Sequence, residues 1–153
     1  MDPVTAIGLV AASAQLVGQG ASVLKYLSDV KEAPRQAEKL LNEMTAMIDV
    51  VTLLKLRFDS FPERIPESQQ TPITDSLDSL KELLQEMEAR CDPKQRRGAI
   101  QRLKWPFQMK ETVQYLEKIQ RQKEILNLVL QNEQLYGLCP LSTKTLQAQA
   151  RED

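Results

Sequence analysis

The 153-residue chain contains no histidine and has only two cysteines and five glycines. Without histidine it lacks the commonest general base and the commonest metal ligand in proteins. Cys91 and Cys139 have no partner at a zinc-binding spacing, and two cysteines do not make a disulfide framework. The scattered glycines form neither a phosphate-binding loop nor a nucleophile elbow. We therefore expect a protein that is not an enzyme and that uses no cofactor and no metal.

The overall composition is that of one soluble globular domain. Hydrophobic residues make up 42% of the chain, charged residues 27%, and the net charge is −1 with a pI near 5.6. No global field attracts nucleic acid, so we expect no nucleic-acid partner. Asp2 stands where a secretory signal peptide would carry basic residues, which predicts that the protein is intracellular.

The first long stretch of the chain lacks charge altogether. No charged residue occurs between Asp2 and Lys25. A helix over this stretch is about 33 Å long, close to the thickness of a bilayer's hydrocarbon core. Its eight strong apolar residues supply only about −2.4 to −4.8 kcal/mol toward insertion, and its glutamines, serines and glycines oppose this. The balance near zero predicts a helix that folds into a soluble bundle and enters lipid when many copies are gathered.

Small residues repeat at a spacing of four within this stretch. Gly8 and Ala12 form one pair, and Ala14, Gly18 and Ser22 continue the spacing on an adjoining strip. Such residues let helices approach closely, either in lipid or inside a soluble bundle, and the spacing leaves both interpretations open. In the membrane interpretation, the residues that carry insertion are Ile7, Gly8, Ala12, Leu16, Gly18, Ser22 and Val23.

Apolar residues at helical spacing predict an all-α, four-helix bundle. The predicted helices span residues 3–30, 34–58, 71–91 and 108–135, with a short additional helix between Pro93 and Trp105, before the last long helix. Gly137 is expected to stop the last helix, so that the bundle covers residues 1–137 and a tail or linker covers 138–153. Residues 60–71 are expected to form a loop. The buried face of the last helix is predicted to comprise Met109, Val113, Leu116, Ile119, Leu126, Val129 and Leu130.

Basic residues cluster before the last helix, with no acidic residue among them: Lys94, Arg96, Arg97, Arg102, Lys104 and Lys110. Trp105 and Phe107 lie within this cluster. The cluster is either a solvated connector whose aromatics fill the core, or a surface that contacts anionic lipid with its aromatics at the membrane interface. Nucleic-acid binding would use the same cations, but no nucleic-acid motif accompanies them.

Two stretches resemble the fungal HeLo-like domain. The opening MDPVTAIGLVAASAQLVGQGASVLKYLSDVKEAP is similar to the start of that domain, and LKWPFQMKETVQYLEKIQRQKEILNLVLQNEQ is similar to its W-P-F element and final helix. The resemblance covers residues 1–134. It implies an N-terminal effector module of a fungal receptor of the immune (NLR or STAND) type, with a nucleotide-binding domain in the same full-length chain. On this sequence the glycine-zipper positions of the family would be Gly8, Ala12, Gly18 and Ser22.

The leading hypothesis is therefore a cell-death-inducing, membrane-targeting domain. It would rest in the cytoplasm and, once oligomerised, permeabilise the plasma membrane through its first helix, with anionic lipids and other copies of itself as partners. The alternative is a homotypic protein–protein interaction or dimerisation module without membrane activity. The polar residues of the first helix favour this alternative, because they suit a helix that stays in contact with protein.

Overall fold

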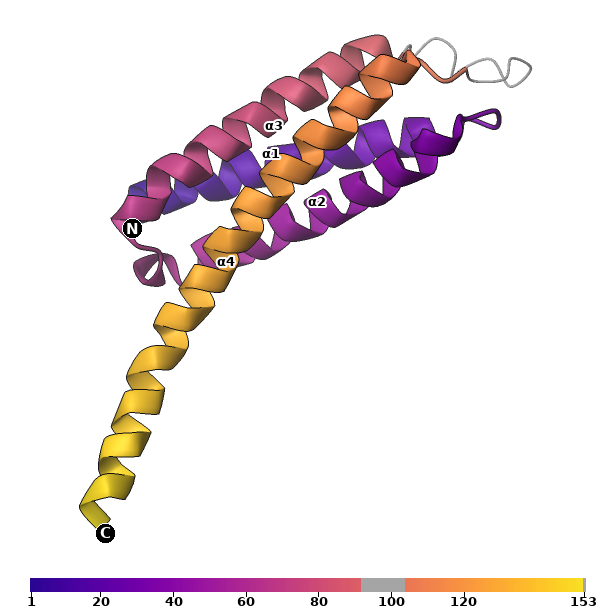
Figure 1. Ribbon diagram of the computed structural model, residues 1–153. Helices are drawn as coiled ribbons and strands as arrows, with labels where there is room; N and C mark the ends of the chain where they lie inside the picture. The colour runs from indigo at the N-terminus through magenta and orange to yellow at the C-terminus, as the bar shows by residue number, and fades with distance from the viewer. Residues whose placement is uncertain (92–103, 153) are drawn as a thin grey trace.

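A computed structural model shows an all-α protein built from four packed helices (Figure 1). It describes residues 1–91 and 104–152, and the side chains of these residues as far as 132. The long helices are α1 (Pro3–Ser28), α2 (Arg35–Ser60), α3 (Gln70–Arg90) and α4 (Met109–Glu152). The described residues contain no strand. The predicted all-α class and four-helix bundle are confirmed.

Local chemistry explains where α1 and α2 begin. Asp2 caps α1 by accepting a hydrogen bond from the Val4 amide at 3.3 Å, and Pro3 occupies the first helical position, where a missing N–H costs nothing. Pro34 adopts an extended conformation directly before α2. The connection between the two helices is short, so α1 and α2 pack antiparallel.

The second connection has more structure than a plain loop. Two short 3-10 helices, η1 (Pro62–Arg64) and η2 (Glu67–Gln69), lie between α2 and α3, and Ile65 between them is buried. This connection carries the chain across the end of the bundle. As a result α3 packs against α1 and α4, while α2 packs against α1 and α4 (Figure 1). The helices α1 and α3 run in the same direction and are neighbours, as are α2 and α4.

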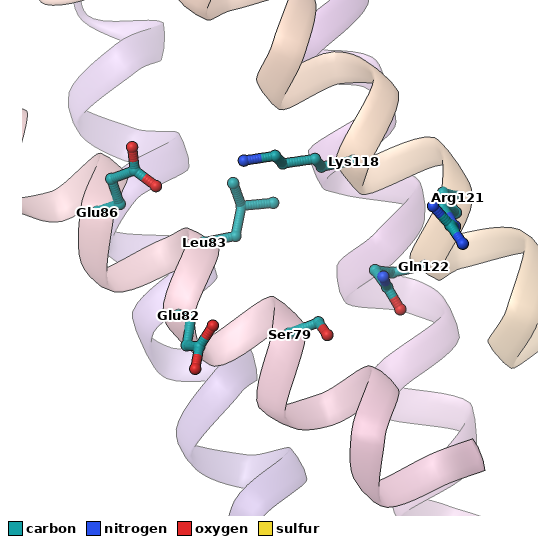
Figure 2. Close-up of a pocket in the computed structure, with 7 residues that line it drawn as sticks. All are labelled: Ser79, Glu82, Leu83, Glu86, Lys118, Arg121 and Gln122. Carbon is teal, nitrogen blue, oxygen red and sulfur yellow. The ribbon is translucent and has the colours of Figure 1, made fainter.

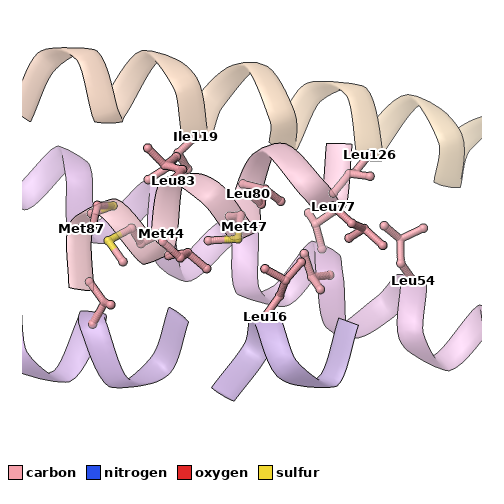
Figure 3. Close-up of a cluster of buried hydrophobic side chains, with 14 of the residues drawn as sticks. Leu16, Met44, Met47, Leu54, Leu77, Leu80, Leu83, Met87, Ile119 and Leu126 are labelled. Carbon is pink, nitrogen blue, oxygen red and sulfur yellow. The ribbon is translucent and has the colours of Figure 1, made fainter. Parts of the chain in front are cut away.

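The core runs along the whole axis of the bundle and is mostly aliphatic (Figure 3). All four helices contribute to it, and its largest fully buried side chains include Leu27, Leu40, Met44, Met47, Leu54, Phe58, Ile73, Leu80, Leu84, Met87, Ile119 and Leu126. The methionines fill the centre, where an unbranched side chain adapts to the space left by leucines. Lys123 of α4 forms an ion pair with Glu43 of α2 at the half-buried edge of this core.

Three predictions about the second half of the chain need correction or stay untested. The predicted short helix falls on residues 92–103, outside the described residues, and is not supported; residues 104–108 after it are not helical. Met109 is 65% exposed instead of buried, because Phe107 and Tyr115 fill the core at that end. The last helix does not stop at Gly137, since no described glycine has the positive φ that ends a helix, and α4 continues to Glu152.

Candidate functional site

The outward side of α1 is a long surface without charge. We call it the outer face of α1, and it comprises the exposed residues Val4, Ile7, Gly8, Ala11, Ala14, Gln15, Gly18, Ala21 and Ser22. The first charged residue after it is Lys25, which is exposed near the end of the helix. A helix on the surface of a soluble protein ordinarily turns charged and polar residues outward. The outer face of α1 departs from this rule over five turns.

The structure divides the residues predicted to carry insertion between two sides of α1. Ile7, Gly8, Gly18 and Ser22 lie on the outer face. Leu16 and Val23 are buried at 2% exposure each and face α2 and α3, and Ala12 is half-buried between the two sides. The side of α1 that faces the bundle carries the buried residues Leu9, Leu16, Gly20, Val23 and Leu27.

The glycines of α1 show which small residues the bundle itself requires. A Cβ added at Gly20 would lie 3.2 Å from Cγ1 and 3.3 Å from Cδ1 of Ile48, so Gly20 permits the close approach of α1 to α2. A Cβ added at Gly8 or Gly18 would meet no atom within 4 Å. An exposed glycine inside a helix costs about 0.5–1 kcal/mol relative to alanine. Packing within the bundle therefore does not explain why positions 8 and 18 are glycine. The spacing in the sequence alone could not decide this question.

The inward side of α1 also contains a polar atom without a partner. Ser13 is fully buried, and its hydroxyl makes no hydrogen bond. Such a group typically costs about 1–3 kcal/mol, because the folded state replaces the hydroxyl's hydrogen bonds to water with nothing. The packing of α1 against the rest of the bundle is therefore weaker than its apolar side chains suggest. Sequence reasoning missed this residue, since nothing in the spacing reveals whether a buried serine has a partner.

The predicted basic cluster is only partly visible. Lys94, Arg96, Arg97 and Arg102 lie outside the described residues. Lys104 and Lys110 are exposed, at the end of the bundle where α3 ends and α4 begins (Figure 1). The N-terminus of α1 lies at the opposite end. The structure thus does not bring these two cations together with the first turns of α1, although both were predicted to contact the membrane.

The two aromatic residues beside these cations face inward. Phe107 is buried and makes edge-to-face contacts with Trp105 at 5.5 Å and Tyr115 at 4.9 Å between ring centres. The half-buried Trp105 donates its indole N–H to Thr112 Oγ1 at 3.1 Å. Burial, and then the nearby Glu86 carboxylate, raises the pKa of Tyr115 to about 12. These packed side chains have a structural role: they attach residues 104–108 to α3 and α4.

A groove of about 270 Å³ runs between α3 and α4 and carries charges of both signs (Figure 2). Glu82 and Glu86 line the α3 side, and Lys118 and Arg121 line the α4 side. Gln122, which also lines the groove, accepts a hydrogen bond at Oε1 from the Ser76 hydroxyl at 2.8 Å. The described residues contain no group of three or more acidic or cysteine side chains that could hold a metal ion.

Comparison with known proteins adds no assignment: no protein-family model, no curated protein and no solved structure matches this chain. The physical properties of α1 therefore carry the functional argument. Among the described helices, α1 alone is long and apolar enough to cross a membrane, by length and composition. Only 28% of its most apolar stretch is buried, whereas the central helix of a soluble protein is mostly buried.

Proposed function

We propose that this chain is a membrane-targeting effector domain that permeabilises membranes through α1 after self-association. The resting form is the cytoplasmic bundle described above, and the active form acts at the plasma membrane. The resemblance to the fungal HeLo-like domain further suggests a cell-death effector module of an immune-type receptor. In that setting a nucleotide-binding domain of the same full-length chain would gather the copies.

The observation that carries this proposal is the exposed, uncharged outer face of α1. A helix inserted in lipid must present apolar or small residues on its outer side, because no water is available there to solvate a charge. Apart from the uncharged Gln15 and Ser22, the outer face of α1 presents apolar or small residues while the bundle is still folded. The marginal apolarity of α1 explains why a single copy of the domain stays in water. Gly8 and Gly18 allow close packing between helices once several copies meet in lipid.

Cations near the start of α4 would assist recruitment to anionic lipid. Each cation near an anionic membrane surface contributes about 1 kcal/mol. Lys104 and Lys110 are exposed and able to take part, while the other four predicted cations lie outside the described residues. The predicted role of Trp105 and Phe107 at the membrane interface is not part of the proposal, because both rings pack against other aromatic side chains of the bundle.

The experiment measures dye leakage from liposomes after the domain has been clustered on an oligomeric carrier. The test variant is Gln15→Glu, which places a charge at the centre of the outer face of α1. A charge at the middle of an inserted helix costs about 2.5–3.5 kcal/mol, and the polar Gln15 already carries part of that cost, so leakage should fall by at least about tenfold. The matched control is Gln85→Glu, the same substitution at an exposed position of α3.

The expected result is strong leakage for the original protein and for Gln85→Glu, and little for Gln15→Glu. Absence of leakage from the clustered original protein would refute the proposal, and so would equal leakage from the two glutamate variants.

The second candidate function is the homotypic interaction module without membrane activity. The exposed Gly8 and Gly18 favour it to the extent that they allow close contact with another helix in water. It predicts a stable dimer in light scattering and no lipid binding.

A further inference from the structure

The groove between α3 and α4 extends beyond the part described above. A second hollow of about 570 Å³ continues it toward the start of α3, and the two parts share Ser79, Arg121 and Gln122. Together their linings reach along α3 from Glu86 back to Thr71, a distance of about four helical turns. The groove is therefore a long feature on one side of the bundle.

Charge is sorted by helix along this groove. The charged residues that line it on α3 are all acidic, namely Asp75, Glu82 and Glu86, and those on α4 are both basic, namely Lys118 and Arg121 (Figure 2). We call the surface formed by these five residues the α3–α4 face. Apart from the hydrogen bond that Glu86 accepts from Tyr115, none of the five has a hydrogen-bond or ion-pair partner among the described residues. Their charges are available to a partner molecule.

A hydrogen bond between the two helices shows which of these charges lie at the same position along the bundle. The Tyr115 hydroxyl donates to Glu86 Oε1 at 3.3 Å. Because α3 and α4 are antiparallel, Glu82 and Lys118, each about one turn further on, lie side by side (Figure 1). Arg121 follows after about one more turn. The acidic row and the basic row therefore run next to each other over the same part of the bundle.

Two neighbouring rows of opposite charge make a surface that is complementary to itself. An isologous dimer brings the same surface of both copies together about a two-fold axis. An axis parallel to the helices places α3 of one copy opposite α4 of the other, so that each acidic row faces a basic row. An axis in the contact plane but perpendicular to the helices places α3 opposite α3, and the two acidic rows repel each other. The distribution of charge favours the parallel axis.

We infer that the α3–α4 face is the surface through which two copies of this chain associate, about a two-fold axis parallel to the helices. This inference rests on the proposed function and specifies its self-association step. With this axis both copies of α1 begin at the same end of the dimer. Both outer faces of α1 stay uncovered, because α1 packs against α2 and α3 and lies diagonally opposite α4. Exposed ion pairs each contribute little and are screened by salt, so the dimer is weak until copies are gathered.

The test measures association of the 153-residue protein by sedimentation equilibrium at low and at high salt. Two variants reverse one row each: Asp75→Lys/Glu82→Lys on α3, and Lys118→Glu/Arg121→Glu on α4. Glu86 is left in place because it bonds Tyr115. Each variant alone should associate at least about tenfold more weakly at low salt, because like charges then face each other. An equimolar mixture of the two should recover association, since a basic face then meets an acidic one.

The matched control is Glu38→Lys/Asp49→Lys, which changes the net charge as the α3 variant does but at exposed positions of α2. It should shift association by less than about twofold, and circular dichroism verifies that every variant is folded. Failure of the original protein to associate at millimolar concentration and low salt would overturn the inference. So would a folded pair of variants whose mixture does not recover association. Association that Gln15→Glu abolishes and the α3 variant retains would overturn it in favour of the outer face of α1.

The two proposals fail separately. Recovery of association in the mixture, together with no leakage from the clustered original protein, refutes the proposed function and leaves the α3–α4 contact standing. Strong leakage from the clustered protein, together with association that neither salt nor the charge reversals affect, refutes the α3–α4 contact alone.

Discussion

At the scale of single residues, two buried serines provide a matched pair. Ser13 on α1 has no hydrogen-bond partner, whereas Ser76 on α3 donates to Gln122. We predict that Ser13→Ala raises the free energy of unfolding by about 1 kcal/mol or more, because it removes a desolvated hydroxyl that gains nothing. Ser76→Ala should lower it by about 1 kcal/mol, since a satisfied hydrogen bond is lost. Urea denaturation measures both changes, and a loss of stability in Ser13→Ala would contradict the assignment.

Gly18 and Gly20 lie two positions apart on α1 and test which small residues serve the bundle. Gly18→Ala should stabilise the protein by about 0.5–1 kcal/mol, because alanine favours the helix and the added methyl group meets open space. Gly20→Ala should gain less than Gly18→Ala, since its methyl group must displace the Ile48 side chain. Thermal or urea denaturation compares the two variants. Equal gains would show that Gly20 is no more constrained than Gly18, and that α1 and α2 are less closely packed than described.

At the scale of helices, the sequence correctly predicted the buried face of a helix where apolar and polar residues contrast strongly. The seam of α3 at Ile73, Leu77, Leu80, Leu84 and Met87 is buried throughout, as its spacing of four and three indicated. The failure at Met109 has a physical reason: the core there is filled from outside the helix by Phe107. Ile119, Leu126, Val129 and Leu130 of the predicted face are buried and Val113 and Leu116 are half-buried, whereas the prediction missed the buried Thr112 and Tyr115.

The candidate site was only half predictable for a related reason. A helix without charges offers little contrast, so the first stretch indicated a helix but not which of its small residues face outward. The structure resolves this by placing Gly8 and Gly18 outside and Gly20 against α2. The pairing of the helices could not be predicted at all. Seams of similar width do not specify partners, and the crossing connection through η1 and η2 determines that α3 lies beside α1.

At the scale of the whole molecule, the proposed function requires α1 to serve two environments in turn. Its outer face suits lipid in the folded bundle, but Leu9, Leu16, Val23 and Leu27 fill the core from its other side. Full insertion must therefore separate α1 from α2 and α3, and the energy of that separation sets how readily the domain is activated. The unsatisfied hydroxyl of Ser13 lowers this energy, which connects a local packing defect to the ease of release.

This connection predicts the leakage behaviour of the same serine pair. If the gain in Ser13→Ala is about 1 kcal/mol, clustered Ser13→Ala protein should permeabilise liposomes about fivefold more slowly, although no change has been made on the outer face of α1. Ser76→Ala weakens the contact between α3 and α4 alone, so its leakage rate should stay within about twofold of the original. A faster rate in Ser76→Ala, in proportion to its lost stability, would mean that the whole bundle unfolds at the membrane and that α1 is not released as a separate element.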